Sequence, residues 1–295
     1  MHNRIACAPC CWGIEEPDNG LNPSWGKVLM EASDCGYRGI ELGPDGYFPE
    51  ESMLTKSACR TRGLEICAGK LQQPFSDSEK MPAILKQTEK TCARLKALGV
   101  GTLLLMEGNH PERFGSLGQS ATAPRLTSEQ KHHLINNMRQ ITSLAQEHGL
   151  RCLLHPGVGG YIGFKDEIEF VLHQFSDSEL GLCLDIGHTF LDGMDPLSLI
   201  RQYANRIEHV HLKDVSTDKL RVAIRDKQPW FDAYSDGLVT PLGDGDIKLN
   251  QVIASLKSID YQGWLVVEHE HNVKQSQQVK VDLQRSRNYL ASLGV

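Results

Sequence analysis

Six short apolar segments of the sequence end in an acidic residue or a histidine, residue types that can bind metal ions or transfer protons. The strands of a parallel sheet read as such apolar segments, and the catalytic groups of an α/β barrel come from the last residues of several strands. The six terminal residues are therefore candidates for one common site. They are Glu41, Glu107, His155, Asp185, His211 and Glu268.

Four of these residues form a candidate metal site. Asp185, His211 and Glu268 end three successive segments, and His155 ends the segment before them. Carboxylate oxygens and imidazole nitrogens suit a divalent ion such as Mn, Co or Mg, and also Zn or Fe, whereas a thiolate site would need clustered cysteines. We expect one divalent ion on these four residues. Taken alone, each could equally be a hydrogen-bonded polar group at a strand end.

Lys213, His188 and Glu41 are the candidates for acid and base catalysis. Lys213 lies two residues after His211, on the same face of the strand. A divalent cation nearby favours a neutral lysine, which can act as a base near pH 7; the alternative is a lysine that only positions the substrate. His188 follows Asp185 by three residues and is expected in the loop after the strand. The sequence does not assign which residue is the acid and which is the base.

Substrate contacts are expected from Trp12 and Glu107, as well as from His188 and Lys213. Trp12 comes just after the first apolar segment, where its indole could stack on a sugar or ring face. Glu270 follows Glu268 in a histidine-rich stretch that we interpret as a loop after the last strand.

These residues can form one site only if the fold brings the carboxyl ends of their segments together. Short apolar segments alternate with amphipathic ones along the chain, which is typical of parallel strands joined by helices. A glycine that would end a helix precedes several of the strands, as in EHGLRCLLH. Strands are predicted at residues 4–9, 37–43, 64–69, 100–106, 150–155, 180–187, 207–214 and 263–270. Helices are predicted at residues 24–35, 50–62, 78–98, 127–148, 165–174, 195–204, 247–258 and 276–292.

The sequence thus predicts an α/β protein with a single (β/α)8 TIM barrel over residues 1–295. The length fits the roughly 250 residues of such a barrel with some loop insertions. Alternation alone does not separate a closed barrel from an open sheet, but no G-x-G-x-x-G follows the first strand to suggest a dinucleotide site. Residues 214–246 exceed a plain connection and are expected to be an insertion that shapes the active site.

The composition disfavours several classes of partner. The formal charge of −6 and the pI near 6.1 argue against nucleic acid as a partner and favour a small neutral molecule. No stretch of 18 apolar residues and no leader-like amino terminus are present, so we expect a cytoplasmic protein without a membrane partner. Nine cysteines, mostly in apolar segments, are interpreted as reduced core residues, including the Cys7 and Cys10 pair.

Several motifs resemble those of the xylose-isomerase-like barrel superfamily, and most closely its inosose dehydratase branch. They are CLDIGH at 183–188, HVHLKDV at 209–215, TPLGDGDI at 240–247 and GWLVVEHE at 263–270, supported by GYRGIELGPDGYFP at 36–49. The resemblance implies a divalent metal on Asp185, His211 and Glu268. His155 stands where many isomerases of the superfamily have a glutamate, and HPGVGG at 155–160 lacks the histidine and threonine that dehydratase-like members carry there.

The resemblance implies a metal-dependent lyase that acts on a cyclic polyhydroxy ketone, such as an inosose, a 3-keto-sugar or a keto-glycoside, through an enediolate. The alternative is a sugar isomerase or epimerase, which forms the same enediolate but returns the proton. His155 favours elimination, because isomerases of this kind use two opposed carboxylates. The changes at Gly157 and Gly160 point to a substrate other than inosose itself. A homodimer or homotetramer is compatible with such a barrel, and the sequence leaves the oligomeric state open.

Overall fold

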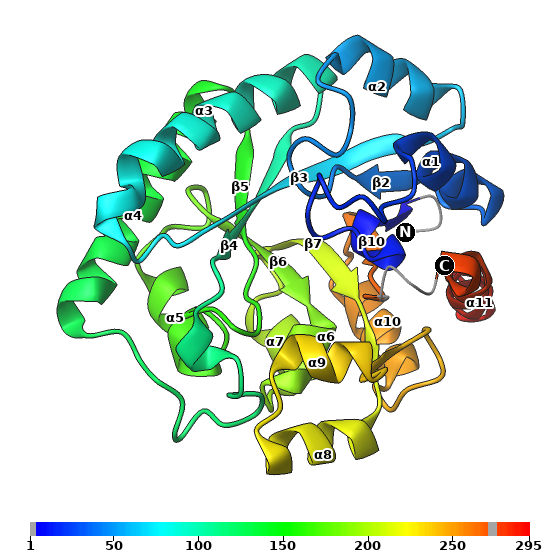
Figure 1. Cartoon of the computed structure of the whole chain (residues 1–295). Coiled ribbons are helices and arrows are strands. Elements are labelled where there is room, and N and C mark those ends of the chain that lie inside the picture. Colours follow the sequence, from blue (N-terminus) through cyan, green and yellow to red (C-terminus); the bar gives the residue numbers. More distant parts are fainter. Residues whose placement is uncertain (1–3, 271–275) are drawn as a thin grey trace.

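Eight parallel strands close into a barrel in the computed structural model, which describes residues 4–270 and 276–295 (Figure 1). Around the barrel the strands follow the order β1-β10-β7-β6-β5-β4-β3-β2, so the first strand pairs with the last and no sheet edge remains open. The predicted TIM barrel is confirmed, and each predicted strand segment overlaps one barrel strand. The strands are β1 (Ile5–Cys7), β2 (Gly39–Glu41), β3 (Glu65–Gln73), β4 (Thr102–Glu107), β5 (Arg151–Leu154), β6 (Gly181–Asp185), β7 (Ile207–Leu212) and β10 (Trp264–Val267).

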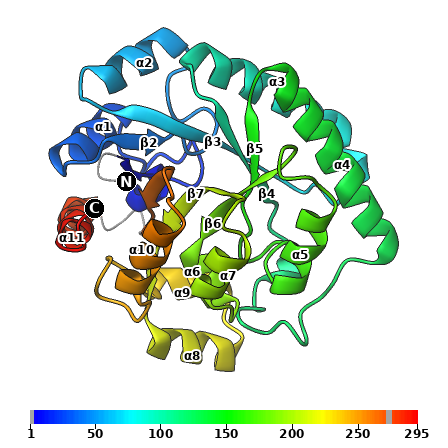
Figure 2. The same ribbon diagram turned by 180° about the vertical axis from the view of Figure 1, so that it is seen from behind.

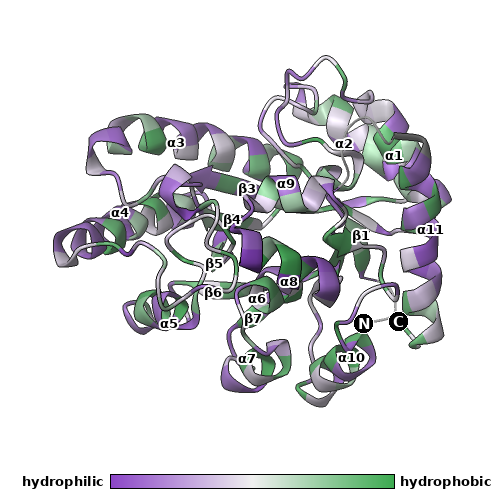
Figure 3. Ribbon diagram, turned by 60° about the horizontal axis from the view of Figure 1, so that its bottom comes forward, coloured by the Kyte–Doolittle hydropathy of each residue, from purple (hydrophilic) through white to green (hydrophobic). Residues whose placement is uncertain are grey.

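Helices surround the barrel, as the views from both sides show (Figures 1 and 2). The amphipathic pattern explains their placement: hydrophobic and hydrophilic residues alternate along helices such as α3 (Figure 3), whose buried residues recur every three or four positions. Gly99 ends α3 with a φ of 76°, a conformation that favours glycine, and the chain then enters β4. The main helices are α1 (Trp25–Asp34), α2 (Ser52–Arg60), α3 (Met81–Leu98), α4 (Ser128–Glu147), α5 (Lys165–His173), α7 (Pro196–Gln202), α10 (Leu249–Ser258) and α11 (Ser276–Ser292).

The inside of the barrel is apolar below and polar at the carboxyl end of the strands. Ala68, Leu104, Leu153 and Cys183 from four neighbouring strands pack together and fill part of the interior. Each is followed two residues later by a residue on the same face of its strand, and on β6 that residue is Asp185. The candidate residues therefore lie on a packed apolar floor.

Two segments differ from the predicted elements. The strand predicted at 180–187 ends at Asp185, because the Asp185 carboxylate accepts a hydrogen bond from the backbone N–H of His188 at 2.9 Å and caps α6 (Ile186–Leu191). His188 therefore lies in a short helix and not in a loop. Strand β3 ends at Gln73, four residues later than predicted.

The predicted insertion at 214–246 folds against the carboxyl end of the barrel. It contains an antiparallel pair, β8 (Asp214–Val215) and β9 (Val239–Thr240), with α8 (Thr217–Asp226) and α9 (Trp230–Ser235) between them (yellow in Figure 1). The Asp214 carboxylate accepts backbone hydrogen bonds from Gly243, Gly245 and Ile247, which folds the GDGD segment into a turn. Among the described residues, no helix is both long and apolar enough to cross a lipid bilayer.

Candidate active site

The four predicted metal ligands converge at the carboxyl end of the barrel. His211 Nδ1 lies 3.1 Å from His155 Nε2, 3.1 Å from Glu268 Oε2 and 3.6 Å from Asp185 Oδ2. His155 Nε2 and Asp185 Oδ2 are also 3.6 Å apart. All four side chains are buried. We call these residues, His155, Asp185, His211 and Glu268, the ligand cluster.

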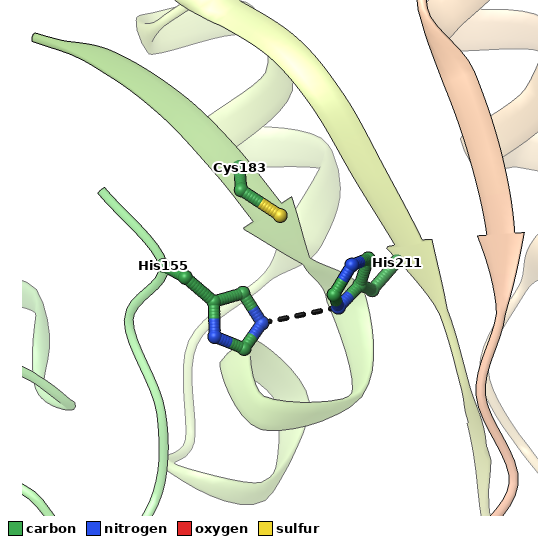
Figure 4. Close-up of side chains that lie close together, drawn as sticks. All are labelled: His155, Cys183 and His211. Atoms are coloured by element: carbon green, nitrogen blue, oxygen red, sulfur yellow. Dashed lines mark hydrogen bonds between the residues drawn. The ribbon is translucent and has the colours of Figure 1, made fainter. Parts of the chain in front are cut away.

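Strand register brings the cluster together. His211 on β7 pairs with Asp185 on β6 and with Val266 on β10, and Glu268 directly follows β10. Figure 4 shows His155 and His211 turned toward each other, with Cys183 of β6 beside them. Cys183 comes one inward position before Asp185, and burial raises the pKa of its thiol to about 11, so it remains a protonated residue beneath the cluster.

The spacing of the cluster fits a single metal ion. A tetrahedral ion with ligand bonds of about 2.1 Å separates its ligand atoms by about 3.4 Å. Four of the six separations in the cluster, at 3.1 to 3.6 Å, bracket that value. Two imidazoles and two carboxylates also form a donor set that divalent ions accept. His155 Nδ1 is buried without a hydrogen-bond partner in the described structure, so its Nε2 is the nitrogen that faces the cluster.

Glu41 lies beneath the cluster and orients His211. One oxygen of its carboxylate, Oε1, accepts hydrogen bonds from His211 Nε2 and His209 Nε2, both at 2.8 Å. Because His211 Nε2 donates to Glu41, the Nδ1 atom of His211 is the one that faces His155, Asp185 and Glu268. A carboxylate behind a histidine is the usual arrangement at metal sites.

This placement contradicts the predicted role of Glu41 as a catalytic acid or base. Burial alone would raise the pKa of Glu41, but His211 and His209 outweigh it and lower the pKa to about 2. The carboxylate is therefore ionised at neutral pH and occupied by two imidazoles.

Lys213 is also placed differently from its predicted role. Its Nζ lies 2.7 Å from Asp185 Oδ2 and 3.1 Å from Glu270 Oε1, and it forms a third ion pair with Glu268. Burial acts to lower the pKa of Lys213, but the three carboxylates outweigh it and raise the pKa well above the ordinary value. Lys213 is therefore a cation that links the acidic side chains, which contradicts the expectation of a neutral base.

His188 meets the site from α6 as a neutral imidazole. Burial lowers its pKa to about 3, against the opposing effect of Asp185. Its Nδ1 accepts a hydrogen bond from the backbone N–H of Val158 at 3.4 Å, so the ring hydrogen belongs on Nε2. Nε2 lies 3.6 Å from Asp185 Oδ2. The side chain thus presents a hydrogen-bond donor toward the cluster.

The structure places the two remaining predicted substrate contacts elsewhere. Trp12 is buried, and its Nε1 donates a hydrogen bond to Glu31 at 2.7 Å; it packs in the hydrophobic core and cannot present its ring to a ligand. The Glu107 carboxylate accepts hydrogen bonds from the Phe75 N–H at 2.8 Å and the Ser76 hydroxyl at 2.7 Å. Both residues therefore stabilise the surrounding loops, and both predicted contacts are corrected.

Two adjoining pockets open beside the ligand cluster. The first has a volume of about 210 Å³ and is lined mainly by polar residues, among them Glu41 and Glu268; we call it the polar pocket. The second has a volume of about 220 Å³, and we call it the aromatic pocket because Trp230, Phe231 and Tyr234 form one wall. The two pockets share part of their lining, which consists of Glu15, Lys70 and Gln72.

Sequence reasoning missed Lys70, Gln72 and Glu270. Lys70 and Gln72 lie in the part of β3 beyond the predicted strand, where polar side chains point into the pockets and interrupt the apolar pattern. Their alternation with buried Leu71 was a signal that could have revealed them. Glu270 lies two residues after Glu268, just beyond the end of β10, and lines the aromatic pocket.

Lys70 differs from Lys213 in its surroundings. In the described part of the chain, it makes no hydrogen bond and no ion pair within 4.0 Å. Burial acts to lower its pKa, but the more distant charges of Glu15 and Glu268 raise it, so Lys70 is an ammonium group. It therefore presents an unpartnered cation at the junction of the two pockets.

Carboxylates outnumber ammonium groups around the cluster, four to two. Burial raises the pKa of Glu270 to about 7. Burial acts to lower the pKa of His211, but Cys183, Glu268 and Glu41 outweigh it and raise the pKa well above its ordinary value, so protons offset part of the difference. A divalent cation would interact favourably with the same carboxylates. The carboxylates belong to Glu41, Asp185, Glu268 and Glu270, and the ammonium groups belong to Lys70 and Lys213.

Residues 29–289 match the family described as the xylose isomerase-like TIM barrel, which is most of the chain. The chain belongs to this family. The predicted resemblance is thus confirmed. An inosose dehydratase of Geobacillus kaustophilus is 28% identical to the chain over 272 residues, which cover 91% of this chain and 88% of that protein.

Solved structures agree on the fold. The probable 3-DHS dehydratase AsbF of Bacillus anthracis superposes with a TM-score of 0.76 at 17% identity, covering 98% of both chains. The IolI protein with a bound zinc atom superposes with a TM-score of 0.75 at 16% identity, covering 98% of this chain and 97% of that one. At these identities the likeness establishes the barrel and its closure, and the chemistry rests on the side chains described above.

Proposed function

We propose that the protein is a metal-dependent carbon–oxygen lyase that acts on a cyclic polyhydroxy ketone, such as an inosose, a 3-keto-sugar or a keto-glycoside. The observation that carries this proposal is the convergence of two imidazoles and two carboxylates beside a pair of ligand-sized pockets. The relationship to inosose dehydratases supports the same reaction class.

His155, Asp185, His211 and Glu268 would hold the ion. Mn, Co, Mg, Zn and Fe are the candidate ions; imidazole ligands and a tetrahedral spacing suit zinc, and the IolI neighbour carries zinc. A bound divalent ion would polarise the ketone and stabilise the negative charge of the enediolate. Glu41 keeps His211 in the orientation that such binding requires.

Glu270 is the base that the geometry favours. One of its oxygens pairs with Lys213, while the other, Oε2, is buried without a hydrogen-bond partner in the described part of the chain. Glu270 also lines the aromatic pocket beside His188. A carboxylate oxygen held without a partner next to the substrate is available to accept a proton.

Lys70 and His188 supply the opposing positive charge and hydrogen-bond donor. The ammonium of Lys70, which has no partner among residues 4–270 and 276–295, faces both pockets. It can protonate a departing oxygen or stabilise the oxygen that becomes negative. The neutral His188 imidazole donates through Nε2 from the other side.

The reaction then proceeds in two steps. Glu270 accepts the proton on the carbon next to the ketone, and the electrons of that C–H bond form the enediolate. The enediolate expels the oxygen on the next carbon with the electrons of its C–O bond, and Lys70 gives that oxygen a proton. Water or an alcohol leaves, and an unsaturated ketone remains.

The assay is incubation of metal-loaded protein with 2-keto-myo-inositol and with 3-keto-sugars in deuterated water. We expect loss of water and a new enone or diketone absorbance. Exchange of the α-hydrogen without loss of water would overturn the lyase assignment and favour the isomerase or epimerase. Absence of a stoichiometric ion after chelation and reconstitution would remove the metal from the proposal.

A further inference from the structure

One wall of the aromatic pocket consists of aromatic side chains from a single short helix. Helix α9 contributes Trp230, Phe231 and Tyr234 to it, and the ring of Trp230 lies 5.2 Å from that of Tyr234 and 5.5 Å from that of Phe231. The rings stand nearly perpendicular to their neighbours, so they form a packed aromatic surface and not isolated side chains. This surface faces the reacting groups, since His188 and Glu270 line the same pocket.

The aromatic wall also carries an unused hydrogen-bond donor. Trp230 Nε1 is buried and has no hydrogen-bond partner in the described structure. A Cβ atom added to Gly159 would lie 2.6 Å from Trp230 Nε1 and 3.0 Å from Asn109 Oδ1, so a donor and an acceptor approach the same glycine. Buried polar atoms are normally satisfied, so the N–H of Trp230, which lies against Gly159, is an exception at this wall.

Gly159 makes this arrangement possible for two reasons. Its φ of +83° favours glycine, and any side chain there would collide with the indole. The HPGVGG segment, in which this chain departs from the expected dehydratase pattern, thus makes room for Trp230. At Gly157 an added Cβ would lie 2.2 Å from Met106 Cε, so the space there is filled from β4.

The volumes indicate two rings. A cavity of about 150 Å³ accepts one six-membered ring such as benzene. The polar pocket measures about 210 Å³ and the aromatic pocket about 220 Å³, and Lys70 lies at their junction. One cyclic ketone would fill one pocket and leave the other to water.

We propose that the aromatic wall of this pocket is a subsite for a second ring of the substrate, while the reacting ring lies where Lys70, His188 and Glu270 line the same cavity. The enzyme would then act on a glycoside-like molecule of two linked rings. The second ring stacks on Trp230, and Asn109, which lines the same pocket, offers a polar group to its substituents. This inference rests on the proposed function, because it assigns the part of the substrate that does not react.

Binding of unreactive glycosides tests the subsite without turnover. Titration calorimetry compares 4-nitrophenyl β-glucoside with methyl β-glucoside, neither of which contains the ketone, on the metal-loaded protein. We expect the aryl compound to bind about tenfold more tightly, because only it places a ring on the wall. Trp230→Ala should reduce that preference to about twofold. Equal binding of the two compounds by the wild type, or an unchanged preference in Trp230→Ala, would overturn the subsite.

Two further variants make the result specific. Val222→Ala removes an exposed apolar side chain of α8 in the same insertion, outside the pocket, and should keep the full preference. Trp230→Phe retains a ring and loses the N–H, so it should keep most of the preference. Loss of the preference in Val222→Ala would contradict the assignment to α9.

The 3-keto derivatives of the same two glucosides distinguish a failure of the subsite from a failure of the lyase function. If neither they nor 2-keto-myo-inositol react while the aryl preference persists, the lyase function fails and the subsite stands. If both 3-keto compounds react with equal kcat/KM, the subsite fails and the lyase function stands. We expect reaction of both, with the aryl compound favoured about tenfold in kcat/KM.

Discussion

Two lysines line the site, and their surroundings assign them different roles. Lys213 contacts three carboxylates and neutralises part of the ligand cluster. Lys70 contacts none of them within 4.0 Å in the described structure and faces both pockets. A cation without a partner is available to a substrate oxygen, whereas a cation with three partners holds its neighbours in place.

Replacement of Lys70 by methionine therefore tests the catalytic assignment. Lys70→Met keeps the length of the side chain and removes the charge, so we expect kcat to fall about a hundredfold with the melting temperature nearly unchanged. Lys56→Met, at an exposed position of α2, is the matched control and should leave both quantities unchanged. A Lys70→Met enzyme with wild-type kcat would assign the proton donation to another residue.

Glu41 acts through His211, so its replacement should affect metal affinity first. Glu41→Gln keeps the shape of the side chain and removes the charge behind His211 and His209. We expect the affinity for the divalent ion to fall at least about tenfold, measured by competition with a chromophoric chelator. Glu65→Gln, at the exposed start of β3, serves as control. An unchanged affinity in Glu41→Gln would mean that His211 is not a ligand through Nδ1.

At the scale of the elements, the apolar pattern of the sequence was sufficient to predict the barrel strands but not the polar segments at their carboxyl ends. The predicted strands are confirmed because their buried faces are apolar on both sides of the sheet, as expected for parallel strands covered by helices. Strand β3 was predicted too short because Lys70 and Gln72 turn into the pockets. Helix α6 was missed because Ile186 and Gly187 continue an apolar strand pattern, and only the cap by Asp185 redirects the chain.

The candidate site, like the barrel, was predicted only in part from the sequence. The ligand cluster was predicted because its residues end apolar strands, and strand ends of a parallel barrel must meet. The roles of Glu41 and Lys213 were not accessible, because they depend on which neighbours each side chain contacts across the barrel. Trp12 follows β1 in the sequence as expected, yet its indole packs away from the pockets against Glu31.

Asp192, which directly follows α6, makes the stability of the fold depend on pH. Burial raises the pKa of Asp192 to about 7, against the opposing effect of Arg113, whereas the ordinary value is 3.8. The folded protein therefore binds more protons than the unfolded chain between these values. The stabilisation from the neutral carboxyl is fully present below pH 3.8 and is lost as pH rises through about 7.

The variant Asp192→Asn, which cannot ionise, isolates this effect. We expect the free energy of unfolding of the wild type, relative to this variant, to be lower at about pH 8 than at about pH 5 by about 2 kcal/mol. Urea unfolding at both pH values measures it. Asp218→Asn, on the exposed surface of α8, should show no such change. A difference between wild type and Asp192→Asn that does not vary with pH would contradict the buried neutral carboxyl.

At the scale of the whole molecule, the carboxylates at the mouth of the barrel would link metal binding to stability. The ligand cluster combines residues from β5 to β10, so an ion bound there joins separate parts of the barrel. Only the folded chain brings these groups together, so binding shifts the folding equilibrium toward the native state.

Addition of a divalent ion should raise the melting temperature. At a free ion concentration about one hundred times Kd, the stabilisation amounts to about 2.7 kcal/mol. Calorimetric scans with and without a chelator measure the shift. Asp185→Ala removes a ligand and should abolish both this shift and turnover. Full activity of that variant, or an equal shift in it, would contradict the proposed site.

Closure of the barrel between β1 and β10 fixes when the site can exist during synthesis of the chain. Strand β10 occupies the gap between β1 and β7, and it is the last strand of the barrel to leave the ribosome. Glu268 follows it directly, so the ligand cluster lacks one of its four residues until β10 has been made. Until then β1 and β7 present unpaired edges, and the proposed metal site is incomplete.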